Sequence, residues 1–253
     1  LFNSIEFLIF LPLVFFGYWF AFKYLRWQNL FVVAVSYLFY GWWDWRFLLL
    51  ILFTSLCSYL SGVYLEKCAG NRSVQTWISA GNILLNLSIL GVFKYFDFFT
   101  ENLVNVLHLL GWDADYVTLN ILLPVGISFY TFQILSYVVD VYRGDVKAQR
   151  NFIDLAAYIA MFPQLIAGPI VRYSDIASQL EHRTHSLADV AAGARRFVLG
   201  LGKKVLLANV FYELITTFKA SGDRSVLFYW LYAAACVLNI YFDFSGYSDM
   251  AIG

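Results

Sequence analysis

The stretch FLLLILFTSLCSYLSGVYL, residues 47–65, carries no charged side chain. At about 1.5 Å per residue, a helix of this length can cross the roughly 30 Å hydrocarbon core of a bilayer. The whole chain has the same character, because 61% of its 253 residues are hydrophobic and only 13% are charged. A water-soluble domain is nearer one half apolar. The sequence therefore predicts an all-α membrane protein.

Charge and cysteine content narrow the possible partners. The chain has 17 basic and 17 acidic residues, so its formal net charge is zero. A balanced charge gives no indication of a nucleic-acid partner. Cys57, Cys68 and Cys236 are scattered and lack the spacing of metal ligands. We expect no nucleic acid and no metal.

Further apolar segments lie on both sides of residues 47–65. The first of these segments, residues 4–22, could be a signal peptide. However, Glu6 precedes its apolar run while Lys23 and Arg26 follow it, and this order of charges is the reverse of that in a signal peptide. Residues 101–111 are too short to span a bilayer, so we expect an interfacial helix there. We expect membrane spans at residues 4–22, 29–43, 47–65, 77–99, 121–142 and 226–244.

The loops between these spans alternate in charge. Basic residues gather in 66–76 and again in 143–150, whereas the loop after residue 100 carries Glu101, Asp113 and Asp115. The positive-inside rule then predicts that both basic loops face the cytoplasm and that the N-terminus faces outside. Tryptophans near the span ends, such as Trp42 and Trp45, fit an aromatic belt at the membrane surface.

The segment FPQLIAGPIVRY, residues 162–173, interrupts the helical pattern. Asn151 is placed to cap a helix that should end before Pro163. This helix is too short to cross a bilayer. The residues that follow are too apolar for a solvated turn, although an ordinary surface loop is the alternative. Irregular backbone at membrane depth must be buried in protein or line a wet cavity. We interpret this as a re-entrant segment inside a helical bundle.

A long helix is expected after this segment. Its start is marked by the capping pattern Ser186-x-x-Asp189. Its first half is basic and should lie along the cytoplasmic interface. The basic residues are Arg195, Arg196, Lys203 and Lys204.

Two of the expected spans carry polar stripes. One consists of Gly126, Tyr130, Gln133, Tyr137 and Asp140, which are spaced by three or four residues; the other consists of Asn239, Asp243, Gly246 and Tyr247. Such spacing places each set on one helical face. The stripes could be hydrogen-bond contacts between helices. Intramembrane polar residues also commonly face a cavity, and the re-entrant segment favours this second interpretation.

Several long motifs resemble the membrane-bound O-acyltransferase (MBOAT) family. They are LLPVGISFYTFQILSYVVDVYRG (122–144), MFPQLIAGPIVRYSDI (161–176) and YFDFSGYSDMAIG (241–253), with SIEFLIFLPLVFFGYWF (4–20) and SYLFYGWWDWRF (36–47) near the start. They are most similar to the branch of bacterial alginate O-acetyltransferases and of the D-alanyl transferase of teichoic acid. The resemblance implies one MBOAT-type domain over residues 1–253, with membrane helices around a tunnel. An acyl group would pass through it from a cytoplasmic donor to an outer hydroxyl.

The resemblance also implies which residues form the site, but it gives none of them a catalytic role. Pro163, Gln164, Gly168, Pro169 and Arg172 would shape the tunnel, Asp243, Ser245, Tyr247 and Asp249 would lie against the catalytic centre, and Gln133 and Asp140 would line the approach. The family's general base is a histidine in a Trp-His-x-Ser type motif that follows the last of these stretches. The sequence stops at Gly253, before that motif, and begins at Leu1. It is therefore expected to be the front part of the enzyme, inactive alone.

The chain's own histidines do not fit the role of the base. His108 belongs to the expected interfacial helix, and His182 and His185 lie in a polar loop. Their H-x-x-H spacing could hold a metal with a third ligand, but a solvated pair is favoured. Among carboxylates, Asp243 is the single candidate for a substitute base.

The resulting hypothesis is a multi-pass enzyme of the bacterial cytoplasmic (inner) membrane that acetylates hydroxyls of an exported polysaccharide such as alginate. The donor would be acetyl-CoA or an acetylated carrier, with no resident cofactor. Membrane lipid, the polysaccharide and other subunits of an acetylation or export complex would be its partners. D-alanyl transfer to teichoic acid is the alternative enzyme. A transporter or flippase is disfavoured because no inverted repeat is visible.

Overall fold

The computed structural model describes residues 4–21, 24–42, 44–112, 122–165, 168–221 and 225–253. In these ranges the regular structure is helical, without strands, which confirms the all-α class. The chain divides into two compact units, and each is described by itself. Unit 1 comprises residues 1–35, 162–169 and 182–253, and unit 2 comprises residues 36–161 and 170–181.

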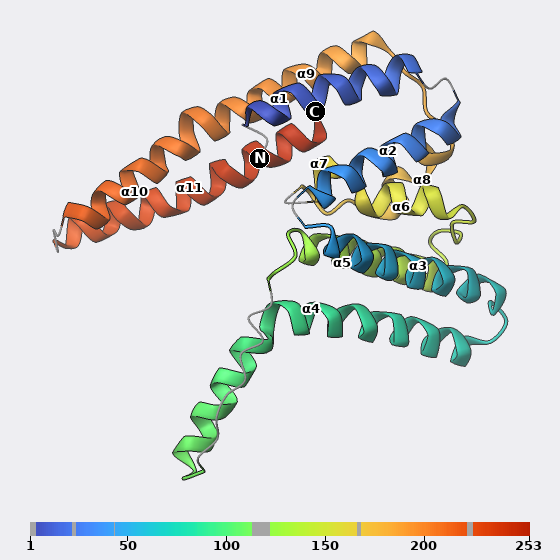
Figure 1. Ribbon diagram of the computed structural model, residues 1–253, viewed down its shortest axis with the longest axis horizontal. Helices are drawn as coiled ribbons and strands as arrows, with labels where there is room; N and C mark the ends of the chain where they lie inside the picture. Colours follow the sequence, from blue (N-terminus) through green and yellow to red (C-terminus); the bar gives the residue numbers. More distant parts are fainter. Residues whose placement is uncertain (1–3, 22–23, 43, 113–121, 166–167, 222–224) are drawn as a thin grey trace. The chain divides into compact units, whose positions relative to one another are not determined.

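The helices are labelled in Figure 1. They are α1 (Ile5–Phe16), the π-helical η1 (Gly17–Ala21), α2 (Leu25–Gly41), α3 (Arg46–Lys67), α4 (Arg72–Leu109), α5 (Ile127–Arg143), α6 (Phe152–Ala160), α7 (Phe162–Leu165), α8 (Tyr173–Glu181), α9 (Leu187–Gly202), the π-helical η2 (Lys203–Ala208), α10 (Asn209–Ser221) and α11 (Val226–Ile252). Within the described ranges, α3, α4 and α11 are long and apolar enough to cross a membrane.

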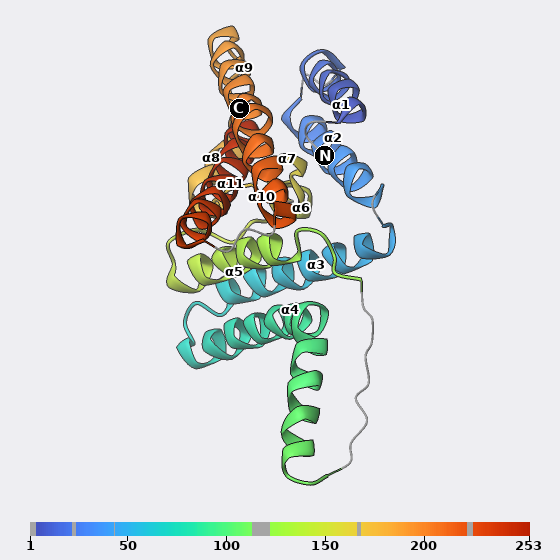
Figure 2. The ribbon, with the colours of Figure 1, turned by 90° about the vertical axis from the view of Figure 1, so that its left-hand side faces the viewer.

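Unit 2 is built on α3, α4 and α5, which lie side by side in Figures 1 and 2. At one end of this layer, the guanidinium of Arg72 donates to the carbonyl oxygen of Tyr142 at 2.9 Å and stacks on the Tyr142 ring. At the same end, Arg150 forms an ion pair with Glu66 at 2.9 Å. The two basic loops that the sequence assigns to one side of the membrane therefore lie at one end of the unit.

Polar side chains join α3 to α4. The Asn82 amide donates to the hydroxyls of Ser58 and Ser61, at 3.2 and 3.1 Å, and the Asn86 amide donates to Asn82 Oδ1 at 3.0 Å. Asn82 and Asn86 are almost fully buried. Contacts of this kind hold membrane helices together where the surrounding lipid supplies no hydrophobic driving force.

Tyrosines fill the core where α5 meets α3, α6 and α8. Tyr137 lies so close to α3 that a Cβ added to Gly62 would be 2.4 Å from the Tyr137 hydroxyl. The Tyr137 ring meets that of Tyr173 edge to face, and the ring of Tyr158 packs on Tyr173 in the same way. The Tyr158 hydroxyl also donates to the carbonyl oxygen of Val171 at 2.8 Å. The core thereby fixes the chain just before α8.

Unit 1 contains a long antiparallel hairpin, in which α9, η2 and α10 form one arm and α11 forms the other (Figure 1). At one end, the rings of Phe218 and Phe228 meet edge to face, with their centroids 5.2 Å apart. At the other end, Gly193 lies against Gly253. The pairing keeps one register from end to end.

Several element boundaries differ from those expected, and two of the differences have a clear local cause. The helix expected at 121–142 begins only at Ile127, because Gly126 has φ of 76° and a turn closes from the Pro124 carbonyl to the Ile127 amide. Gly126 is thus the residue before the helix and not a member of its polar face. The separate helix expected at 101–111 is instead continuous with α4, which bends along its length (Figure 2). No glycine or proline lies between Lys94 and Leu109 to stop it.

The helix caps agree with those predicted from the sequence. The Asn151 side chain accepts a hydrogen bond from the Ile153 amide, and α6 ends at Ala160, before Pro163. The Ser186 hydroxyl accepts from the Asp189 amide at 3.0 Å, as the capping pattern predicts. The last helix extends past the expected end at 244 to Ile252, and Gly246 in its final part lies against Gly200 of α9.

Candidate functional site

Glycines bring α9 and α11 into backbone contact. A Cβ added to Gly200 would lie 2.6 Å from the carbonyl oxygen of Gly246 and 2.7 Å from the amide nitrogen of Met250. Seven residues away along each helix, a Cβ on Gly193 would lie 2.4 Å from the carbonyl oxygen of Gly253. Small residues permit this close approach between membrane helices. The polar side chains that flank the glycines are thus within reach of the facing helix.

Asp249 of α11 is the centre of one group of contacts. Its carboxylate accepts from Arg196 Nε at 3.1 Å and from Lys203 Nζ at 2.6 Å. Lys203 Nζ also donates to the Ser245 hydroxyl at 3.0 Å. One lysine therefore joins two of the residues that the resemblance assigns to the catalytic centre.

A second group lies earlier along α11. Lys204 Nζ contacts Asp243 Oδ1 at 2.5 Å. The Asn239 amide donates to the carbonyl oxygen of Ala208 at 2.7 Å. Both Lys204 and Ala208 belong to the π-helical η2, and π-helical turns are frequent at functional sites.

We call these side chains the α9–α11 charge cluster: Arg196, Lys203, Lys204, Asp243, Ser245 and Asp249. Their charged side chains are between 20% and 48% exposed. Charges in such partly buried positions interact more strongly than charges in water. Three cations face two carboxylates, so the cluster keeps one positive charge and suits an anionic group.

We call the described part of residues 162–169 the Pro-Gly segment. It lies beside this helix pair in unit 1, because its α7 packs against α11. Gln164 is buried, and its carbonyl oxygen accepts from the Gly168 amide at 3.1 Å. A Cβ on Gly168 would lie 2.4 Å from the Gln164 Cα. Pro163 and Pro169 are half-buried on either side. Residues 166 and 167 lie outside the described residues.

The polar face of α5 lies in unit 2. Tyr130, Gln133, Tyr137 and Asp140 are all buried there, so the expected face is confirmed apart from Gly126. Within the described part of the chain, the Tyr130 hydroxyl, Gln133 Oε1 and Asp140 Oδ2 have no hydrogen-bond partner. Buried polar atoms of this kind usually bind water or a ligand.

Arg172 is exposed, at the start of α8, and its charge interacts with that of Asp140. The next residue, Tyr173, is buried, and burial raises the pKa of its hydroxyl to about 12. The phenol therefore stays neutral and accepts a hydrogen bond from the Gln149 amide at 3.1 Å. This bond holds the backbone beside Arg172 in place.

The histidines take other positions. His182 and His185 lie in the loop between α8 and α9, as expected. His185 Nε2 is 3.1 Å from the Tyr18 hydroxyl, and Arg183 Nη1 donates to the same hydroxyl at 2.7 Å. The loop is thus fastened to η1. In the described ranges, no three His, Cys, Asp or Glu side chains gather as a metal site would require.

The comparisons with known proteins agree on a family. Residues 147–253 match the membrane-bound O-acyltransferase family. The chain is 43% identical to a probable alginate O-acetylase of Azotobacter vinelandii, over 100% of this chain and 50% of the relative. It is 31% identical to a peptidoglycan O-acetyltransferase of Helicobacter pylori, over 100% of this chain and 53% of the relative. A teichoic acid D-alanyltransferase of Bacillus subtilis is 26% identical over 53% of this chain and 35% of the relative.

These matches confirm the resemblance found in the motifs. The chain contains a membrane-bound O-acyltransferase family domain, matched over residues 147–253, and it is a membrane protein. It spans about half the length of the alginate and peptidoglycan relatives that it matches.

The sequence interpretation missed the cationic half of the charge cluster. It assigned Arg196, Lys203 and Lys204 to the cytoplasmic membrane surface, which stays a prediction, and it did not include the ion pairs that they form with carboxylates of α11. A signal was available, because Asp243 and Asp249 in an apolar helix need partners of opposite charge. The basic residues of the helix that starts after Ser186 were the obvious source of those partners.

Proposed function

We propose that the protein is an O-acyltransferase that moves an acetyl group onto hydroxyls of an exported polysaccharide such as alginate. The observation that carries this proposal is the 43% identity, over 100% of the chain, to a protein named as a probable alginate O-acetylase. The similarity to a peptidoglycan O-acetyltransferase supports the same reaction on a related class of acceptor. D-alanyl transfer is less well supported, since that relative is 26% identical over about half of the chain.

The α9–α11 charge cluster is the part of the site to which we assign the donor side. Its extra positive charge suits an anionic donor, such as the phosphates of acetyl-CoA or of an acetylated carrier. Asp243, Ser245 and Asp249 hold the cations in place, and Tyr247 continues their face. The reaction also needs a base that removes the proton of the acceptor hydroxyl while it attacks the acyl carbonyl. None of the residues above is assigned that role.

On the strength of the motifs shared with the family, we propose a role in the path of the acyl group for the Pro-Gly segment of unit 1 and, separately, for the α5 face of unit 2. The buried atoms of Gln133 and Asp140 that lack partners among the described residues are suited to a hydrated or ligand-lined path. In unit 1 the proposed residues are Pro163, Gln164, Gly168 and Pro169, in the segment whose α7 packs against α11, and in unit 2 the proposed residue is Arg172, just before α8. We further propose that the protein works in the cytoplasmic membrane with other subunits of an acetylation or export complex.

The proposed activity can be tested by deleting the gene in its own organism and restoring the whole gene. Ester-linked acetate on the exported polysaccharide, measured by proton NMR, should disappear on deletion and return on restoration. The same cells should be assayed for acetate on peptidoglycan and for D-alanine on teichoic acid. A change confined to peptidoglycan acetate would reassign the acceptor, and a change confined to D-alanine would refute acetylation.

Topology is testable by cysteine labelling in intact cells. The positive-inside rule places position 113 outside and position 147 in the cytoplasm. An engineered Asp113→Cys should therefore react with a membrane-impermeant maleimide, and Lys147→Cys should react only after permeabilisation. The native cysteines are replaced first and serve as the background control. The opposite labelling pattern would invert the proposed orientation.

A further inference from the structure

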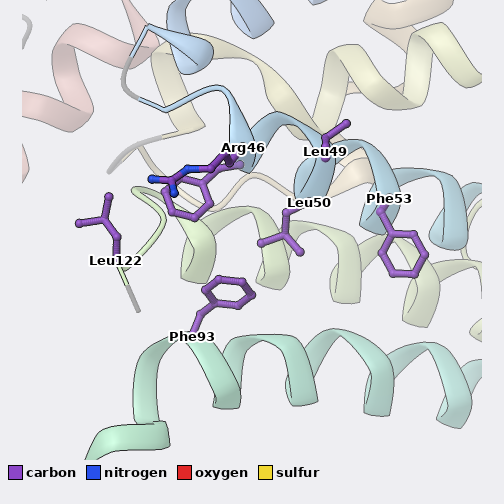
Figure 3. A pocket seen from close by; sticks show the side chains of 7 residues that line it. Arg46, Leu49, Leu50, Phe53, Phe93 and Leu122 are labelled. Carbon is purple, nitrogen blue, oxygen red and sulfur yellow. The ribbon is translucent and has the colours of Figure 1, made fainter. Parts of the chain in front are cut away.

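A pocket of about 650 Å³ lies in unit 2 between the beginning of α3 and α4. Figure 3 shows its lining, with Phe93 of α4 facing the side chains of α3. Six of the seven lining residues are apolar, and the seventh is Arg46, at the end where Leu122 also lies. The volume is within the range of small-molecule sites in proteins. The pocket is thus an apolar trough with one cation at its end.

The position of the trough along α3 relates it to the membrane surface. Arg46 is the first residue of this candidate span, and the nearby Trp42 and Trp45 are 84% and 67% exposed. Exposed tryptophans at a span end mark the boundary between water and hydrocarbon. From Arg46 to Phe53 the trough follows α3 for about two turns, or about 10 Å. It therefore begins at the polar boundary and extends into the hydrocarbon.

The guanidinium of Arg46 is held in a fixed direction. Asp44 accepts from the Arg46 backbone amide, from Nε and from Nη2, the last at 2.7 Å. Nη1 has no hydrogen-bond partner within the part of the chain that the structure describes. Two-thirds of the Arg46 side chain remains exposed. A preoriented arginine with a free donor is well suited to a phosphate oxygen.

From these observations we infer that the trough binds one phospholipid, with its phosphate diester at Arg46 and one acyl chain along Leu50, Phe53 and Phe93. A soluble anion would make no use of the apolar floor. A lipid in the general annulus would make no use of Arg46. Only a molecule that is anionic at one end and aliphatic beyond it matches both features at the depth where phospholipids lie.

The test uses the whole protein, purified in mild detergent, with phosphatidylglycerol as the probe and native mass spectrometry as the readout. Arg46→Gln should weaken retention of one phosphatidylglycerol about tenfold, the effect of losing a hydrogen bond to a charged group. Lys67→Gln is the matched control, because it removes a basic residue at the other end of the same helix, and it should bind as the wild type does. Leu122→Trp should fill the trough from its exposed side and also reduce retention.

Several outcomes would overturn the inference. One is equal retention of phosphatidylglycerol by Arg46→Gln and Lys67→Gln, which would show that the bound lipid belongs to the general annulus around the protein. Another is equally tight binding of glycerol 3-phosphate, which has no acyl chain and would mark a simple phosphate site. A third is a protein subunit cross-linked through Leu122→Cys in native membranes, which would show that a partner fills the trough. Thermal unfolding of each variant, matched to the wild type, establishes that altered retention is not misfolding.

Discussion

Gly200→Ala is expected to destabilise the protein by about 1–3 kcal/mol, the usual cost of overpacking a close contact. The added methyl group would lie 2.6 Å from one backbone atom of α11 and 2.7 Å from another. Backbone atoms cannot move aside as a flexible side chain can, so the two helices must separate. The charge cluster should then lose its geometry, and acetate transfer should fall with stability.

Gly202→Ala is the control, and the opposite change in stability is expected for it. This glycine is two residues further along the same arm, has helical φ and ψ of −60° and −45°, and has nothing within 4 Å of its Cβ position. Alanine there should be neutral or stabilising by up to about 1 kcal/mol, because glycine is the poorer helix former. Thermal unfolding of both variants in the same detergent measures the difference. Equal midpoints would mean that α9 and α11 do not pack through these glycines.

Gly168→Leu is expected to reduce acetate transfer about 100-fold or more while the protein still inserts into the membrane. Such losses follow when a reacting group is displaced by about 1 Å. Any side chain at this position meets the Gln164 backbone, at 2.4 Å for the Cβ alone, so the segment beside α11 must shift. The readouts are ester-linked acetate on the polysaccharide and the amount of protein in the membrane fraction.

Gly81→Leu is the matched control for this experiment. Gly81 is an exposed glycine of α4 with nothing within 4 Å of its Cβ position, so the same substitution should leave transfer unchanged. Gly168→Ala should give an intermediate loss. Full activity in Gly168→Leu would indicate that the Pro-Gly segment is an ordinary surface loop. A loss of membrane-inserted protein would indicate that Gly168 is needed for folding, and it would give no support to a role in the acyl path.

Sequence patterns predicted those parts of the fold that depend on local rules. The caps at Asn151 and Ser186 were found because a side chain that accepts from a nearby amide needs only three or four residues to be recognised. The α5 face was found because its spacing matches a helix. The late start of α5 was missed, since apolar residues before Ile127 conceal a turn that depends on Gly126 in the left-handed region.

Contacts between distant elements were harder to predict. The partners of Asp243 and Asp249 lie about 40 to 50 residues earlier in the chain, and only the packing of α9 on α11 brings them together. The continuity of α4 was missed for another reason. A polar patch around Glu101 was interpreted as a boundary, but helix formation depends on backbone geometry and continues where no residue breaks it.

The hairpin of unit 1 also bears on how the protein is made. One arm ends at Ser221 and the other begins at Val226, so the contact of Phe218 with Phe228 joins residues close in sequence. Each later contact along the hairpin then closes only a short additional loop. Closing successive loops from such a starting point costs little chain entropy at each step. The hairpin can therefore form as a zipper from its closed end during synthesis. The carboxylates of α11 would then form their ion pairs with the preceding arm as the hairpin closes.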